Sequence, residues 1–296
     1  MFTSVKVFVI TQVLNRLANA LPHNAKNYLL THSLAPEAHR IVSALNRERL
    51  AHIYLQGEGL ELGALNNPLP VSPLAKVKYV DFATANDVAE QFPGHEVKQP
   101  DIVDDAVTLS SVADCSQDFV IACHILEHLE DPIGALKTWF RVLRPSGLLF
   151  MSIPDRRFTF DFHRSATPLA HLLQDHEKGP AWSREAHFAE LEQEYRQTYD
   201  VHDEEILRQL TDWHRGGRGH THFHVWTQIE MLELVIALRR SGLSFDVECF
   251  CAYGNEGTFI LRKGSRETVE FAENSLSEAR IEVAELVEKL RRNPAA

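Results

Sequence analysis

DFVIACHILEHLEDPIGALKTWFRVLRPSGLLFMSIPD, residues 118–155, is the stretch of the chain whose pattern decides the fold. It begins with the apolar run Phe119–Cys123 and ends with a second run, Leu148–Ile153. Between them, Pro132–Leu143 carries apolar residues at helical spacing and is followed by a proline and a glycine, which end a helix. Two short apolar runs around one amphipathic helix are typical of parallel strands joined by a crossover helix.

The same pattern extends in both directions along the chain. Upstream, Gly59–Leu62 and Val77–Asp81 are short predicted strands. Downstream, a helix over Thr227–Arg240 precedes two more predicted strands, Phe245–Cys251 and Thr258–Leu261, joined as a hairpin. The sequence therefore predicts an α/β sheet domain over residues 51–264. We expect a helical segment before it (1–50), a long insertion within it (155–225) and a helix after it (265–296).

Composition and charge exclude several classes of protein. The net charge of −11 argues against nonspecific binding to nucleic acid or anionic membranes, because the positive surplus that neutralises phosphates is missing. No run of about 20 apolar residues is present, so we expect no membrane span. The four cysteines form no CxxC pair, which fits reduced thiols and predicts a cytoplasmic protein.

The C-terminal segment from Glu267 to Arg292 has apolar residues at alternating spacings of three and four. This spacing holds for about three heptads, as in a coiled coil. Two interpretations remain open. The helix packs on its own domain, or it forms a homodimer with a second copy of the chain.

Two features of the first half point to a nucleoside-containing ligand. Leu60–Ala64 is a buried strand that breaks at Gly63, where backbone without a Cβ allows a ligand to approach closely. Asp81 ends the next strand, where an acid can bind both hydroxyls of a ribose. A nicotinamide-binding motif is the competing interpretation, because Gly57 and Gly59 precede Gly63. The three prolines that follow would interrupt the helix which that motif requires.

At this point the sequence resembles a known family. Residues 118–155 are similar to the second half of class I S-adenosylmethionine-dependent methyltransferase domains, above all in the segment LRPSG with the strand after it. LELGALNNP, residues 60–68, resembles a variant of the family's first motif. The resemblance covers about 100 residues and implies a Rossmann-like sheet of seven strands that binds S-adenosylmethionine.

The resemblance also implies roles for individual residues. Glu61, Gly63 and Ala64 would line the methionine part of the cofactor, and Asp81 would bind its ribose. Asp104 or Asp105 would contact the adenine, and His124 would lie beside the sulfonium. One departure from the family pattern is that the later glycines are missing. Only about 13 residues separate Gly63 from the second strand, so the first crossover helix is predicted to be short or absent.

A divalent metal site is a further hypothesis. His124, Glu127 and His128 have i, i+3, i+4 spacing and would share one face of a helix. Two imidazoles and a carboxylate are suitable ligands, with His220, His222 or His224 as a further donor. Alternatively, His124 contacts only the cofactor, His128 caps a helix and the later histidines serve packing.

The insertion 155–225 is predicted to bind the acceptor of the methyl group, because loops beyond the carboxyl ends of parallel strands line the binding crevice. Its mixture of charged and aromatic residues suits a small polar molecule or a glycan, although it equally fits a charged helix seated on the domain. In the first case, His163 or His224 is the predicted general base.

Two functions from different classes follow. The first is O-methylation of a small polar molecule or glycan with S-adenosylmethionine. The second is a catalytically retired methyltransferase-like fold that acts as a binding or scaffold protein. The altered glycine turn and the heptad pattern of the C-terminal segment motivate the second.

Overall fold

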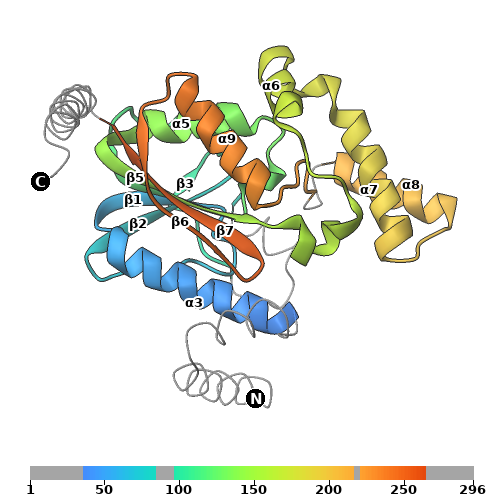
Figure 1. Cartoon of the computed structure of the whole chain (residues 1–296), viewed down its shortest axis with the longest axis horizontal. Coiled ribbons are helices and arrows are strands. Elements are labelled where there is room, and N and C mark those ends of the chain that lie inside the picture. Colours follow the sequence, from blue (N-terminus) through green and yellow to red (C-terminus); the bar gives the residue numbers. More distant parts are fainter. Residues whose placement is uncertain (1–35, 85–96, 217–220, 265–296) are drawn as a thin grey trace, which may run out of the picture.

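A computed structural model of the chain describes residues 36–84, 97–216 and 221–264. Over these ranges, seven strands form one sheet in the order β3-β2-β1-β4-β5-β7-β6 (Figure 1). The strands are β1 (Gly57–Leu62), β2 (Ala75–Asp81), β3 (Ile102–Val103), β4 (Gln117–Cys123), β5 (Leu143–Pro154), β6 (Phe245–Tyr253) and β7 (Glu256–Lys263). The pairs formed among β1 to β5 are parallel, and β7 pairs antiparallel with both β5 and β6. The predicted seven-stranded α/β sheet is confirmed.

Helices cover both faces of this sheet. One face carries α3 (Pro36–Tyr54), and the other carries α5 (Pro132–Val142) and α9 (Gln228–Arg240) (Figure 1). Residues alternate between the two faces along each strand. In β4, for example, Phe119 and Ile121 belong to the core on the α3 side, whereas Val120 and Ala122 belong to the core that includes α5. Burial on both faces explains why β4 and the end of β5 are continuous apolar runs.

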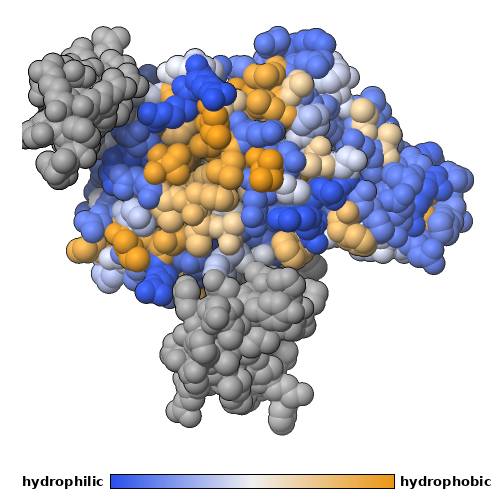
Figure 2. All heavy atoms as spheres, in the orientation of Figure 1, coloured by the Kyte–Doolittle hydropathy of each residue, from blue (hydrophilic) through white to orange (hydrophobic). Residues whose placement is uncertain are grey.

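The insertion between β5 and α9 is helical and projects from one end of the sheet (Figure 1). Its α-helices are α6 (Leu169–Lys178), α7 (Arg184–Thr198) and α8 (Glu204–Arg215). Its 3₁₀ turns are η2 (Arg156–Phe158), η3 (Phe160–His163) and η4 (Pro180–Trp182). We call this insertion, residues 155–227, the arm. Figure 2 shows that the outer surface of α7 and α8 is mainly hydrophilic, while hydrophobic residues gather over β6 and α9.

The structure describes only part of the predicted N-terminal helical segment and none of the predicted C-terminal helix. The helical segment was expected to end near residue 50, but α3 continues to Tyr54 because Ala51 and Leu55 are fully buried against the sheet. The N-terminal part of the chain up to residue 35 and the C-terminal segment 265–296 lie outside the described residues. Among the described helices, none has the length and apolar character needed to cross a bilayer.

The connection between β1 and β2, residues 63–74, contains no helix, as predicted from its prolines. Gly57 and Gly59 lie inside β1 instead of in a phosphate-binding turn, so the nicotinamide interpretation has no structural basis. The connection folds back over the sheet, and Leu69 enters the core on the α3 side. There the Leu69 amide donates a hydrogen bond of 2.8 Å to Oε1 of Glu61, whose side chain is buried.

Burial raises the pKa of Glu61 to about 7 from an ordinary value of 4.5. The folded protein therefore holds this proton more tightly than the unfolded chain. Its contribution to stability is complete below pH 4.5 and is lost as the pH rises through about 7. We expect Glu61→Gln, which stays neutral, to gain up to about 3 kcal/mol of unfolding free energy relative to wild type between pH 5 and 8. Urea unfolding of both proteins across this range measures the difference, and parallel pH profiles would disprove the assignment.

Candidate functional site

The ends of neighbouring strands bring most of the predicted cofactor residues to one edge of the sheet. Gly63 follows β1, Asp81 ends β2 and His124 follows β4, and these three strands are adjacent in the order β2-β1-β4. Backbone hydrogen bonds continue the pairing at this edge, from the Gly63 amide to the Val80 carbonyl and from the Asp104 amide to the Asp81 carbonyl. In parallel α/β sheets this carboxyl edge is where ligands bind.

Gly63 has a left-handed backbone, with φ of 57°, which favours glycine. A Cβ added there would lie 2.4 Å from Cδ1 of Ile125. The side chain of Ile125 therefore occupies the space that a side chain at position 63 would need. The carbonyl of the neighbouring Ala64 accepts a hydrogen bond from the Asn67 amide and so closes the turn. The glycine is required by the turn and by this packing, in addition to any approach of a ligand.

The two acidic residues after β3 shape their own turn. Both carboxylate oxygens of Asp104 accept hydrogen bonds, from the amide of Asp105, the hydroxyl of Ser110, and the amide and hydroxyl of Ser111. These bonds outweigh the effect of burial and lower the pKa of Asp104 to about 2. Asp105 accepts from the Val107 amide at 2.7 Å. Their predicted contact with adenine stays a prediction.

His124 lies at the centre of an ion-pair network. Its backbone φ is 56°, uncommon for a residue other than glycine and found more often at functional sites. Its Nε2 is 2.7 Å from Oε2 of Glu256, the same oxygen that accepts from Nη1 of Arg47 at 2.7 Å. Sequence analysis missed Arg47 and Glu256, because they are distant in the chain and show no local pattern. The network joins α3, β7 and the end of β4.

The three predicted metal ligands do not lie on an α-helix. Glu127 and His128 belong to the 3₁₀ turn η1 (Leu126–His128), and His124 precedes it. Oε1 of Glu127 is nevertheless 3.7 Å from Nδ1 of His124 and 4.0 Å from Nε2 of His128. His222 of the arm completes a compact group with Glu127 and His128, whose ligand atoms all lie within 4.8 Å of one another. His124 stands beside this group rather than within it.

Glu127 is the buried member of this group. Its side chain is 1% exposed, and within the described residues neither carboxylate oxygen has a hydrogen-bond partner. Burial raises its pKa above the ordinary value, although His124 and His222 act in the opposite direction. A buried carboxyl group with a perturbed pKa, placed at the carboxyl edge of the sheet, is typical of a functional position.

His222 is oriented by a buried aspartate of the arm. Its Nδ1 lies 2.6 Å from Oδ2 of Asp161, which also receives a hydrogen bond from Arg164 on its other oxygen. Burial alone would lower the pKa of His222, but Asp161 and the nearby Glu127 raise it above its ordinary value. The pKa of Asp161 is lowered, because hydrogen bonding and charge from His222 and Arg164 outweigh its burial. An ionised carboxylate that holds one imidazole nitrogen is a common way to orient a general base.

The two predicted bases occupy very different positions. His163 is exposed, and its ring packs on Phe162 with 3.8 Å between centroids. His224 is fully buried, with Nδ1 3.0 Å from the Leu129 carbonyl and Nε2 2.9 Å from Oδ2 of Asp175. Both ring nitrogens of His224 are engaged inside the arm, so its position does not favour the predicted contact with an acceptor.

A hollow of about 560 Å³ lies at the opposite edge of the sheet. Its lining includes Gly57 and Asp118, near the amino ends of β1 and β4, and Arg144, which pairs with Asp118 at 2.5 Å. None of the predicted site residues contributes to it. Most of the predicted cofactor residues lie instead at the carboxyl edge.

Comparison with known proteins gives a family for this sheet. Residues 57–151 match the family model described as "Methyltransferase domain". No curated protein sequence matches the chain. Many solved structures do, although at low similarity.

Three of these structures illustrate the level of similarity. An S-adenosylmethionine-dependent methyltransferase from Methanosarcina mazei is 20% identical over 73% of this chain and 97% of its own, with a TM-score of 0.39. Another from Thermotoga maritima is 17% identical over 85% and 99%, with a TM-score of 0.40. A protein from Pyrococcus horikoshii is 17% identical over 80% and 96%, with a TM-score of 0.42. Because these scores are low, the assignment rests on the family model, which matches β1 to β5. The part of the chain from Gly57 to Met151 is therefore similar to a methyltransferase domain, in agreement with the resemblance seen in the sequence.

Proposed function

We propose that this protein transfers the methyl group of S-adenosylmethionine to a hydroxyl oxygen of a small polar molecule or a glycan. The observation that supports this proposal is the contact between the arm and the carboxyl edge of the sheet. The arm contributes His222 and Asp161 to a polar group that includes Glu127 and lies beside His124. An acceptor hydroxyl positioned there would meet groups able to remove its proton.

On the cofactor side, we propose that Asp81 binds the ribose hydroxyls and that Gly63 and Ala64 lie along the methionine part. Asp104 and Asp105 form the turn beside the adenine, and His124 lies near the sulfonium. Glu61 stabilises the connection after β1 through its bond to the Leu69 amide, so its contribution to binding is to hold this connection in place.

On the acceptor side, the arm offers polar and aromatic groups next to each other. Phe158, Phe160 and Phe162 are between 38% and 49% exposed, and Phe160 packs on the ring of His222 with 4.7 Å between centroids. Arg157 forms an ion pair of 2.6 Å with the buried Asp155 at the end of β5. Exposed aromatic faces among charged groups suit a ring with hydroxyls better than a hydrocarbon chain.

Catalysis in this proposal consists mainly of alignment and proton removal. S-adenosylmethionine supplies a sulfonium that releases its methyl group as the carbon–sulfur bond breaks. His222, held through Nδ1 by Asp161, accepts the acceptor's hydroxyl proton at Nε2 while the oxygen attacks the methyl carbon. Glu127 faces His222 and stabilises the imidazolium that results. His163, the exposed base predicted from sequence, is the alternative proton acceptor.

A divalent metal at His124, Glu127 and His128 is a separate hypothesis for the same group. Nε2 of His124 already bonds Glu256, and His222 takes its place beside Glu127 and His128. We favour proton transfer here, because the Asp161 bond gives His222 the orientation of a base. If a cation binds to this group, Glu127→Gln should lose it. The metal content of the purified variant measures this loss.

The direct test is transfer of labelled methyl groups from S-adenosylmethionine to a panel of glycans and small hydroxylated compounds, with amines and lipids as comparison acceptors. Labelling of hydroxylated compounds alone supports the proposal. Labelling of amines or lipids would contradict the acceptor class. Binding of S-adenosylhomocysteine without transfer to any acceptor would instead favour the retired fold, with partners sought through residues 267–292. The homodimer and the cytoplasmic location stay predictions.

We expect Asp81→Ala to weaken binding of S-adenosylhomocysteine by tenfold or more. Loss of a charge-assisted pair of ribose hydrogen bonds costs about 1.5–3 kcal/mol. Calorimetric titration measures the change. Asp246→Ala is the matched control, because Asp246 is 60% exposed and lies at the start of β6, away from the carboxyl edge. Equal affinities of the two variants would show that Asp81 does not bind the ribose.

We expect His222→Ala to lower kcat by about 100-fold or more, the usual contribution of general base catalysis, with little effect on cofactor affinity. Because its base form is neutral and its pKa is raised, the rate of wild type should increase with pH above the ordinary histidine value. Asp161→Asn should shift this increase to lower pH. A pH profile unchanged by both substitutions would exclude His222 as the base and favour His163.

A further inference from the structure

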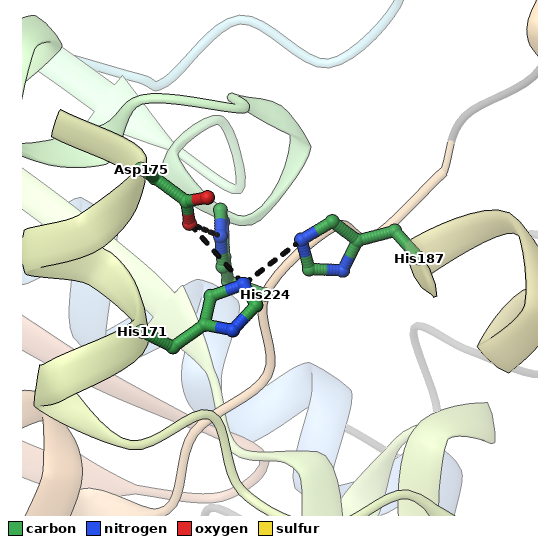
Figure 3. Close-up of side chains that lie close together, drawn as sticks. All are labelled: His171, Asp175, His187 and His224. Atoms are coloured by element: carbon green, nitrogen blue, oxygen red, sulfur yellow. Dashed lines mark hydrogen bonds and ion pairs between the residues drawn. The ribbon is translucent and has the colours of Figure 1, made fainter. Parts of the chain in front are cut away.

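The arm contains a second cluster of ionisable side chains, separate from the group around Glu127. His171 and Asp175 of α6, His187 of α7 and His224 of the segment before α9 point toward one another (Figure 3). One ligand atom from each lies within 4.8 Å of all the others. Asp175, His187 and His224 are buried, and the side chain of His171 is 23% exposed.

The same atom of each histidine faces this centre. Nε2 of His171 is 3.1 Å from Nε2 of His187 and 3.3 Å from Oδ2 of Asp175. Nε2 of His224 is 2.9 Å from that same oxygen. Four ligands at the vertices of a tetrahedron around zinc, each about 2.0–2.1 Å from the ion, lie about 3.3 Å from one another. The three separations given above, from 2.9 to 3.3 Å, are close to that value.

Local structure explains why these residues meet. His171 and Asp175 are four positions apart and share one face of α6. Gly179, with φ of 81°, ends α6, and the 3₁₀ turn η4 leads directly into α7. His187 then lies in the first turn of α7, facing α6.

The hydrogen bonds of His224 restrict its protonation. A carbonyl oxygen only accepts, so the contact between Nδ1 and the Leu129 carbonyl places a proton on Nδ1. In a neutral imidazole, Nε2 then carries a lone pair, and this lone pair faces a carboxylate oxygen of Asp175. Two lone pairs at this distance repel each other unless a cation or a second proton lies between them. Burial disfavours the doubly protonated, charged ring.

We propose that His171, Asp175, His187 and His224 bind one divalent transition-metal ion, with zinc as the best match. Three imidazole nitrogens and one carboxylate oxygen suit zinc better than magnesium or calcium, which prefer oxygen ligands. Four protein ligands complete a tetrahedron and leave no position for substrate. The site is therefore structural rather than catalytic.

Groups around the cluster hold the ligands as expected for a metal site. Oδ1 of Asp175 accepts from the Ser183 hydroxyl at 2.6 Å, which leaves Oδ2 to face the centre. Nδ1 of His224 donates to the Leu129 carbonyl, and Nδ1 of His187 lies 3.9 Å from Oε2 of Glu190. The hydrogen bond to the Leu129 carbonyl fixes the tautomer and the ring orientation of His224, whereas the contact of His187 is an ion-pair distance only.

The ion would connect the arm to the catalytic part of the domain. His171, Asp175 and His187 belong to the α6–α7 pair, whereas His224 lies in the segment that returns to the sheet. That segment is bonded to the turn after β4 through the amides of Phe223 and His224, which both donate to the Glu127 carbonyl. Metal binding therefore would stabilise the position of α6 and α7 beside the proposed acceptor site.

The test begins with the metal content of the full-length wild-type protein, measured by elemental analysis after expression with added zinc. We expect about one zinc per chain. After removal of zinc with a chelator, added Co²⁺ should give the intense visible absorption of tetrahedral cobalt with nitrogen and oxygen ligands. Chelation should also lower the Tm, because the metal binds the folded state only.

Variants locate the ion. His187→Gln and Asp175→Asn should reduce the metal content to below about one tenth per chain, and their Tm should no longer respond to the chelator. His202→Gln is the matched control, since His202 is an exposed histidine of the same arm. Glu127→Gln tests the other histidine group and should retain the metal.

Three results would overturn the proposal. They are a metal-free wild type that gives no cobalt spectrum, equal metal content in His187→Gln and wild type, and loss of metal from Glu127→Gln with retention in His187→Gln. A wild type without metal and without a cobalt spectrum would mean that the four side chains form a hydrogen-bonded ion pair instead of a metal site. None of these measurements depends on methyl transfer, so they stand apart from the test of the proposed function.

Discussion

A parallel sheet covered by helices on both faces can present ligand-binding groups only where its strands end. In this protein α3 lies on one face, and α5 and α9 lie on the other, so the strands themselves are filled with core residues. The polar residues that the sequence offers, from Gly63 to Asp155, are placed one after another at the carboxyl ends. This constraint explains why the predicted cofactor residues meet at one edge of the sheet.

The arm is attached to this edge of the sheet by backbone hydrogen bonds. Its returning segment pairs with the chain next to β5 through a bridge between Asp155 and Trp226. It also donates two amides to the Glu127 carbonyl. These backbone bonds place His222 beside the end of β4 and His224 inside the arm. A short stretch of chain therefore supplies one histidine to each of two clusters.

Much of this fold could be predicted from the sequence, because its strands are short apolar runs with clear turns between them. The ends of most predicted strands agree with those of the structure to within two or three residues, as for β4. The exception is β5, which begins five residues before its predicted start at Leu148. The helix α3 runs to Tyr54, beyond the expected end near residue 50, since burial of Ala51 and Leu55 outweighs the polar run before them.

The sites were less predictable, because their residues meet only in the folded chain. The spacing of His124, Glu127 and His128 suggested a helix, but a 3₁₀ turn forms there and His222 joins from the arm. His224 belongs to a histidine-rich segment that is visible in the sequence. The sequence does not show that Oδ2 of Asp175 lies 2.9 Å from Nε2 of His224. His187 carried no signal, because an isolated histidine in a helix is common. Only the pair at i and i+4 in α6 offered a local hint.

The network of Arg47, Glu256 and His124 has a consequence for the evolution of the chain. Glu256 is 209 residues from Arg47 and 132 from His124, yet one buried oxygen of Glu256 bonds to both. A neutral residue at Glu256 would leave the guanidinium of Arg47 partly buried without its counter-charge. Natural relatives that lose the glutamate should therefore also have lost the arginine. The three positions are expected to covary, although they belong to different elements of the fold.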